Sequence, residues 1–365
     1  MIIILLILTY VFSPYIYAQL NFDVSDQIAL SQPLTVKWFY ESKLTVNLTP
    51  ATDGERTYLP LTSGILVSLQ SANGQLYWKA DLGGELSASP LANDSSIYIA
   101  TETIGEQSKI PRANGTIRAL GREGGITLWI RTLPMPLRGS LIANEINLFG
   151  GSTDGRFYAF RKKTGDISWV MQHSAPFNSH PIIFGSNLFI GSNDGYLFSL
   201  RHGTGTLNWR YRTRGSIRGR AVAVLGTVYF GSTDGYVYAV GETDGRLKWR
   251  RRTGGGVQTV GLAQNGIVVA SFDNFVYLLS FTKGDRLWKR QLAGRIAAQP
   301  LIANDGALFT PLSSSTGVVL DLFNGKQINS LPIGDDNSMT ASPIAAGNML
   351  LVTTRHGLIA FSRPN

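Results

Sequence analysis

The chain has 365 residues, a net charge of +9 and no cysteine. The lack of cysteine excludes disulfide bonds, thiolate metal sites, a cysteine nucleophile and lipid attachment through an N-terminal cysteine. A chain of this length often divides into two domains, but the internal repeat described below favours a single large one.

Residues 1–18 are predicted to be a secretory signal peptide, and residues 19–365 a single domain. The segment 2–18 is almost wholly apolar and ends at Ala18, a residue that suits cleavage. Positive charges are missing before the apolar run, so an uncleaved anchor is the alternative, although the run is short for a transmembrane helix.

The tryptophans mark a repeat that runs through the whole chain. Their successive spacings are 40, 51, 40, 40, 40 and 39 residues. Six of them close the motif Gly-x-x-x-Trp, and a further copy at Gly325 carries Asn329 instead. A period near 40 with one large aromatic residue per unit is typical of a repeat architecture. We expect the tryptophans to be structural spacers between neighbouring units: Trp38, Trp78, Trp129, Trp169, Trp209, Trp249 and Trp288.

Each repeat carries the signals of four short antiparallel strands. Asp154-Gly155, Asp194-Gly195 and Asp234-Gly235 lie between β-rich runs, and an Asp-Gly pair is a strong hairpin signal. A second turn, such as Thr204-Gly205, precedes the strand that carries the tryptophan. Four strands in about 40 residues is the size of a propeller blade.

Eight such groups follow one another, so the predicted fold is an all-β, eight-bladed β-propeller of four-stranded antiparallel blades. The inner strands and hairpins fall near residues 49–69, 88–120, 139–160, 180–200, 219–240, 259–279, 298–320 and 341–361. The last group lacks a fourth strand, while the strand 36–40 precedes the first group and carries Trp38. We expect this N-terminal strand to complete the C-terminal blade, because closure removes two exposed sheet edges.

The interval of 51 residues before Trp129 is the largest irregularity in the repeat. The extra residues lie near Thr101 to Asn114 and include the polar run 106–109. We expect an enlarged hairpin loop there, exposed and mobile.

The positive charge is concentrated between Arg201 and Arg252, where eleven Lys and Arg face three acidic residues. Positions one and three after a tryptophan share a strand face, so rows are expected across neighbouring blades at Arg210 with Arg250 and at Arg212 with Arg252. Protection of an outermost strand explains such residues. The alternative is an anionic partner, either membrane headgroups or an acidic protein face. Nucleic acid is not expected, because the basic residues are not interleaved with aromatic residues along a groove.

No constellation of catalytic or metal-binding residues is present. The four histidines have no metal-ligand spacing, and turn geometry accounts for most aspartates. The sequence therefore predicts no catalytic residue, cofactor or metal, and a protein that is not an enzyme.

The repeat resembles the pyrroloquinoline-quinone-type β-propeller family, whose docking motif reads Ala-x-Asp-x-x-Thr-Gly-x-x-x-Trp. Ala159, Thr164, Gly165 and Trp169 match it, while Arg161 replaces the aspartate. One branch of the family, the quinoprotein dehydrogenases, binds the quinone and calcium in a central funnel. That branch is the alternative function, and an envelope polysaccharide-binding or sensor module is another.

The other branch is assembly factor B of the outer-membrane β-barrel assembly machinery, which the chain resembles in length, export signal and last docking motif. The segment 135–139 is similar to the Leu-x-Leu-Arg-Gly loop with which that family docks the barrel-forming subunit. The resemblance implies partner contacts at Met135, Leu137 and Arg138. It also implies a non-enzymatic scaffold, monomeric within a complex, that is periplasmic or associated with the outer membrane without a cysteine lipid anchor.

Overall fold

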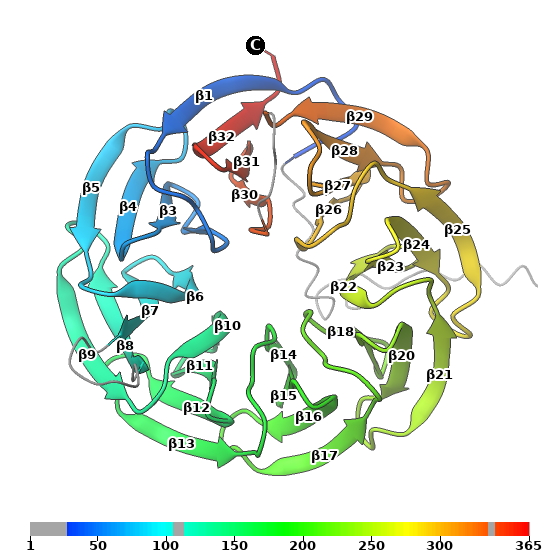
Figure 1. The fold of residues 1–365 in the computed structure, drawn as a ribbon, viewed down its shortest axis with the longest axis horizontal. Coiled ribbons are helices and arrows are strands. Elements are labelled where there is room, and N and C mark those ends of the chain that lie inside the picture. The colour runs from blue at the N-terminus through cyan, green and yellow to red at the C-terminus, as the bar shows by residue number, and fades with distance from the viewer. Residues whose placement is uncertain (1–27, 105–112, 335–339, 365) are drawn as a thin grey trace, which may run out of the picture.

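The computed structural model describes residues 28–104, 113–334 and 340–364, which form a closed ring of strands around a central axis (Figure 1). The strands form six four-stranded sheets and one eight-stranded sheet. The larger sheet consists of two four-stranded units joined by one parallel bridge between Ser89 and Ser140. The ring therefore has eight blades, and the predicted all-β propeller is confirmed. No helix in these three ranges is long and apolar enough to cross a membrane.

We number the blades in chain order, and each of blades 1 to 7 runs from its innermost to its outermost strand. Blade 1 comprises β2 (Ala51–Thr52), β3 (Arg56–Leu61), β4 (Ile65–Gln70) and β5 (Leu76–Asp81). Blade 2 comprises β6 (Glu85–Ala92), β7 (Ser96–Ile104), β8 (Ala113–Gly121) and β9 (Thr127–Leu133). Blade 3 comprises β10 (Leu137–Ala143), β11 (Asn147–Ser152), β12 (Arg156–Arg161) and β13 (Ile167–Gln172). Blade 4 comprises β14 (Ile182–Phe184), β15 (Asn187–Gly191), β16 (Tyr196–Arg201) and β17 (Leu207–Arg212).

The remaining blades repeat this arrangement. Blade 5 comprises β18 (Val222–Val224), β19 (Thr227–Gly231), β20 (Tyr236–Gly241) and β21 (Leu247–Arg252). Blade 6 comprises β22 (Val257–Ala263), β23 (Gly266–Ser271), β24 (Phe275–Leu279) and β25 (Arg286–Gln291). Blade 7 comprises β26 (Leu301–Ala303), β27 (Gly306–Phe309), β28 (Thr316–Leu320) and β29 (Gln327–Pro332). Blade 8 comprises β30 (Ile344–Ala346), β31 (Met349–Thr354), β32 (Gly357–Ser362) and, from the other end of the chain, β1 (Thr35–Glu41).

The ring closes as predicted, with the N-terminal strand around Trp38 completing the C-terminal blade. β1 pairs antiparallel with β32, with Trp38 opposite Ala360 and Tyr40 opposite Leu358. The segment before β1 is held as well, because Ile28 and Leu30 are buried in a cluster shared by blades 7 and 8. The predicted signal peptide lies outside the described residues.

The tryptophans lie on the outermost strands and contact the next blade in every case. Each indole lies against the glycine of the following Gly-x-x-x turn; a Cβ added at Gly205, for example, would come within 2.6 Å of the Trp169 ring. Each Nε1 donates a hydrogen bond of 2.8 to 3.1 Å to the carbonyl three residues before that glycine. The indoles are therefore the ties between successive blades, and glycine is required because any side chain would occupy the space of the ring.

Blade 7 has Asn329 in place of the tryptophan and contacts the next blade through hydrogen bonds. Asn329 on β29 donates from its amide to the carbonyls of Leu30 at 3.0 Å and Gln32 at 2.8 Å. Asp305 accepts from the backbone N–H groups of Leu30 and Ser31 at 3.0 and 2.8 Å. Blade 8 has no turn between its last two strands, because they come from opposite ends of the chain. The N-terminal segment takes the place of that turn.

The extra residues of blade 2 lengthen its central hairpin. β7 and β8 have nine residues each and stay paired out to Ile104 and Ala113. The expectation of an enlarged loop from Thr101 to Asn114 is therefore wrong at both ends, where the chain continues the ladder. Residues 105–112, which include the polar run 106–109, lie outside the described part.

A matched set of variants tests the indole contact at the junction of blades 3 and 4. We expect Trp169→Ala to lower the free energy of unfolding by about 3 kcal/mol, through lost packing and a lost hydrogen bond. Gly205→Ala should cost about 2 kcal/mol, because its φ is positive and the new Cβ enters the ring. Denaturant unfolding measures both.

The control is Gly203→Ala in the same turn, where an added Cβ meets nothing within 4 Å. We expect it to change stability by less than about 0.5 kcal/mol. The double variant at positions 169 and 205 should cost less than the sum of the single changes, because the two residues touch. Strict additivity would show that the contact is not the source of either loss.

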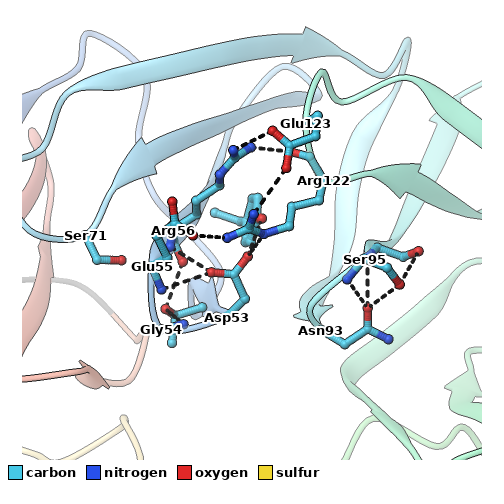
Figure 2. Close-up of polar contacts among 12 residues, drawn as sticks. Asp53, Gly54, Glu55, Arg56, Ser71, Asn93, Ser95, Arg122 and Glu123 are labelled. Atoms are coloured by element: carbon cyan, nitrogen blue, oxygen red, sulfur yellow. Dashed lines mark hydrogen bonds and ion pairs between the residues drawn. The ribbon is translucent and has the colours of Figure 1, made fainter.

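An ion network strengthens the junction of blades 1 and 2 (Figure 2). Asp53 accepts from Arg122 Nε at 2.7 Å, and Arg122 also pairs with Glu55 at 2.6 Å. Arg56 pairs with Glu123 at 2.6 Å and donates to the Arg122 carbonyl at 2.7 Å. That carbonyl is also the acceptor of Trp78, so the network and the indole contact share one atom.

Asp53 is the buried carboxylate of this network. Burial alone would raise the pKa of Asp53, but hydrogen bonds from Arg122, the Arg56 backbone and Tyr58 outweigh it and hold the pKa below its usual value. Blades 5 and 6 repeat the contact between an aspartate and a tyrosine hydroxyl, from Tyr238 to Asp234 and from Tyr277 to Asp273. These aspartates therefore do more than shape the turn, which is all that the sequence indicated.

The lowered pKa of Asp53 predicts a loss of stability in acid. The ionised form is favoured in the folded state, so its contribution is present above the unfolded pKa of about 3.9 and disappears as the pH falls through the lower folded value. We expect Asp53→Asn to cost about 2 kcal/mol at pH 7. The difference from wild type should shrink as the pH falls below about 4. Denaturant unfolding at several pH values, with exposed Asp94→Asn as control, checks this; a difference that grows in acid would contradict it.

Candidate functional site

The segment 135–139 covers the end of the connection from the outermost strand of blade 2 and the first three residues of the innermost strand of blade 3, β10. Its backbone is fixed, because the carbonyls of Met135 and Pro136 accept from the Ser152 hydroxyl at 3.3 and 3.2 Å. Gly139 has a positive φ, and a Cβ there would lie 2.2 Å from the Ser179 carbonyl of blade 4. This glycine is therefore required by close approach of two backbones.

Leu137 does not have the exposure that a partner contact needs. Its side chain is 0% exposed and belongs to the core cluster between blades 2 and 3. The partner contact that the resemblance implied at Leu137 therefore has no exposed side chain to support it in this structure. Arg138 pairs with Glu102 of blade 2 at 2.6 Å and remains one-third exposed, and Met135 is half-buried. These two side chains reach the surface.

An exposed apolar row lies immediately before this segment in the chain. Ile126, Leu128 and Ile130 are 73%, 60% and 53% exposed, although Trp129 between them faces blade 3. At the corresponding positions blade 4 has Thr206, Asn208 and Arg210, and blade 5 has Arg246, Lys248 and Arg250. An alignment of the repeats on their tryptophans would have revealed this row. We call Ile126, Leu128 and Ile130 together with Met135 and Arg138 the blade 2 surface.

The basic residues of blades 4 and 5 lie at the outer edge of the ring, as predicted for an outermost strand. Arg210 and Arg212 lie over the Tyr196 ring at 5.1 and 5.3 Å, and Arg250 lies over Tyr236 at 5.1 Å. Arg212 and Arg250 line one crevice of about 420 Å³ between the two blades. Arg210 and Arg252 are exposed but do not line it. We call Arg210, Arg212, Arg250 and Arg252 the basic rim.

Other basic residues of the outer strands have a structural role. Two positions after the tryptophan, Arg131 and Arg251 pair with Asp166 and Asp285 of the next blade, both at 2.5 Å. Arg290, at the same position in blade 6, donates to the Gly325 carbonyl at 2.6 Å. These arginines bind the same turns of the next blade that the indoles contact. No such ion pair is found for the four basic-rim residues within the described ranges.

The innermost strands surround a central cavity of about 880 Å³ that residues from all eight blades line. Six repeats place a polar residue on it, eleven positions after the tryptophan: Thr49, Ser89, Ser140, His180, Arg220 and Gln299. Hydrogen bonds join several of them across blades. The Thr49 backbone donates to the Ser89 hydroxyl at 3.2 Å, and the Ser342 backbone donates to the Thr49 hydroxyl at 3.0 Å. We call these six side chains, together with Ser342, Arg218 and Gln258, which line the same cavity, the axial collar.

The titratable side chains among the described residues that line this cavity are basic types, and they come from neighbouring blades. They are His180 of blade 4 with Arg218 and Arg220 of blade 5. Burial lowers the pKa of His180 and that of Arg220. His180 is therefore neutral near pH 7, whereas an arginine keeps its charge. Among the described lining residues there is no Asp or Glu.

These residues do not fit a calcium-bound quinone. Calcium takes oxygen ligands that are largely carboxylates, whereas the lining of the cavity offers basic groups, hydroxyls and amides. The described residues also contain no group of three His, Asp or Glu that could hold a metal ion. Two of the other three histidines have side-chain partners, His173 with Asp194 at 2.9 Å and His202 with Asn144 at 3.0 Å.

Several solved structures share this fold. BamB from Moraxella catarrhalis is 16% identical with a TM-score of 0.73, and the match covers 91% of this chain and 98% of that one. The quinohemoprotein alcohol dehydrogenase from Comamonas testosteroni is 9% identical with a TM-score of 0.77, covering 94% of this chain and 79% of that one. The computationally designed Ika8 protein is 14% identical with a TM-score of 0.75, covering 90% and 99%. At these identities the likeness shows the fold alone.

Sequence comparison assigns the family. No curated protein matches the chain significantly. The family described as outer membrane protein assembly factor BamB matches residues 113–222 and 214–365, which together are more than half of the chain. The protein therefore belongs to the BamB family of pyrroloquinoline-quinone-type β-propellers.

Proposed function

We propose that this protein is a non-enzymatic scaffold that is exported and acts in the assembly of outer-membrane β-barrel proteins by binding a protein partner. The family match over residues 113–365 carries this proposal. It implies a place in the periplasm or at the outer membrane, with the barrel-forming subunit of the assembly machinery as the partner.

The dehydrogenase alternative has less support from the residues. The dehydrogenases among the similar structures share the fold at identities of 9 to 11%. The lining of the axial cavity includes two arginines, Arg218 and Arg220, whose positive charge would repel a divalent cation. A scaffold needs no such site, and its binding surface lies elsewhere on the ring.

The blade 2 surface is the partner site that we propose. Leu128 and Ile130 are exposed at alternate positions of β9, and Ile126 lies just before that strand. Met135 follows in the connection to blade 3, and Arg138 lies at the start of β10. Methionine and arginine are enriched at protein interfaces, and a row of exposed apolar side chains gains free energy when a partner covers it. The Glu102 carboxylate holds the Arg138 guanidinium in place before a partner arrives.

Binding of the full-length chain to the purified barrel-forming subunit tests this surface. We expect Leu128→Ser, and separately Met135→Ser with Arg138→Gln, to weaken binding about 30-fold, the effect of losing a hot spot worth about 2 kcal/mol. Calorimetric titration measures the affinity, and unchanged thermal unfolding of each variant shows that the ring is intact.

Two control variants show whether a loss of binding comes from the blade 2 surface itself or from a general change in the protein. Leu287 occupies the position of Leu128 in blade 6 and is 50% exposed, so Leu287→Ser should bind like wild type. Glu102→Gln breaks the ion pair but keeps Arg138, and binding should persist. If the blade 2 variants bind as tightly as wild type, this surface is not the partner site. If Leu287→Ser is equally impaired, the loss is not specific to it.

We further propose that the basic rim faces anionic lipid headgroups. Its four arginines are exposed, and the tyrosines beneath them hold the side chains of Arg210, Arg212 and Arg250 over a ring face. Weakly hydrated guanidinium groups bind phosphates well. A basic side chain near an anionic membrane contributes about 1 kcal/mol, which is roughly fivefold in affinity.

Sedimentation with vesicles of phosphatidylglycerol and phosphatidylethanolamine tests the rim. We expect Arg210→Gln with Arg250→Gln to reduce binding about 25-fold, and added salt to reduce wild-type binding. The control, Arg161→Gln with Arg201→Gln, removes the same charge from exposed positions outside the rim and should have a much smaller effect. An equal loss in both pairs would mean that net charge alone drives binding, and absence of wild-type binding would favour an acidic protein face.

A further inference from the structure

The axial collar is polar all the way round, but its two halves differ in charge. The half formed by blades 7, 8, 1 and 2 presents Gln299, Ser342, Thr49 and Ser89. Blades 4 and 5 present His180, Arg218 and Arg220 instead. The repeat alone does not require this difference, because the same position accepts a neutral hydroxyl in other blades.

The hydroxyl groups of the neutral half are poised as donors. The hydroxyl oxygens of Thr49 and Ser89 each accept a backbone N–H from the preceding blade, and Ser342 accepts one from Gln299 at 3.0 Å. A hydroxyl that accepts such a bond still carries its own proton, which it can donate. The neutral half therefore offers donors to a ligand on the axis.

The opposite half adds positive charge and further donors. Arg218 is exposed to the cavity, and Arg220 lines both this cavity and an adjoining one of about 500 Å³. Gln258 also lines the axial cavity, and its Oε1 makes no hydrogen bond among the described residues. Since the two ends of an amide are interchangeable by a half-turn, Gln258 can present its NH₂ group there. Glu145 lies in the adjoining cavity and not in the lining of this one.

We propose that the axial collar is a binding site for a small ligand that carries an oxyanion, a phosphate or a carboxylate group. Arg218 and Arg220 supply the opposite charge, His180 a neutral ring nitrogen, and the hydroxyls of Ser89, Thr49 and Ser342 the facing donors. The volume of about 880 Å³ lies within the range of small-molecule sites, about 300–1,000 Å³. This site is distinct from the blade 2 surface and from the basic rim, and it does not depend on the proposed scaffold function.

Calorimetric titration of the full-length protein with inorganic phosphate and with citrate, at constant ionic strength, tests the collar. We expect saturable binding of at least one of them, and the comparison of the two separates a phosphate site from a carboxylate site. Arg220→Gln should weaken binding about tenfold or more, as expected for loss of a charged hydrogen-bonding partner. Arg218→Gln, at an exposed position that the fold tolerates, should do the same and keeps the test decisive if Arg220→Gln fails to fold.

Arg246→Gln is the matched control, because it removes one positive charge from the same blade at a side chain that is 88% exposed. It should change phosphate or citrate affinity by less than about twofold, since an exposed charge outside the cavity contributes little. The proposal is overturned if wild type binds neither anion, if Arg218→Gln binds as wild type does, or if Arg246→Gln loses as much. Binding of either anion only in the presence of calcium would also overturn it, because the site would then be a cation site.

Discussion

The contact between an indole and the glycine turn of the next blade is the constraint on which the rest of the ring depends. A four-stranded blade has two apolar faces and can bury them only against its neighbours. The indoles make this packing specific, because each ring lies on one glycine and its Nε1 bonds one carbonyl three residues earlier. The contact lies at the outer strands, far from the axis (Figure 1). It fixes the angle between blades without the help of the side chains that line the axial cavity, so those side chains can differ from blade to blade.

The fold could be predicted because its determinants are local and repeated. The spacing of the tryptophans gives the period, the Asp-Gly pairs give the hairpins, and the unpaired strand around Trp38 gives the closure. The burial of Leu137 could not be predicted in this way. Whether a strand residue faces the core depends on its register, and β10 has a register shift between Arg138 and Ile142. The match of Leu137, Arg138 and Gly139 to the family motif does not indicate which way each side chain points.

The net charge of +9 divides into parts with different physical roles, and only one of them could be predicted from the sequence. Alternation along a strand indicates that Arg210 and Arg250 face outward. Arg131 and Arg251 each form an ion pair with an aspartate some 35 residues later in the chain. That aspartate becomes a neighbour only after the blades pack together. Arg220 and His180 line one cavity for the same reason, since one position of each repeat faces the axis, and Arg218 lies two residues before Arg220. In a propeller, side chains that occupy the same position in each sequence repeat form a ring around the axis. A different residue type in one repeat therefore changes the chemistry of that ring at one blade only.

The junction of blades 7 and 8 shows why one repeat lacks its tryptophan. An indole at position 329 would need a glycine turn on blade 8, but the last two strands of that blade come from opposite ends of the chain. The N-terminal segment fills this place, and Asn329 reaches its carbonyls with a short amide. Leu30 buries its side chain beside Leu331 and Phe361 and also donates its N–H to Asp305. The exchange of tryptophan for asparagine is therefore a consequence of closing the ring with two chain ends. Polar contacts and the buried Leu30 side chain hold the junction of blades 7 and 8, whereas an indole holds each of the other junctions.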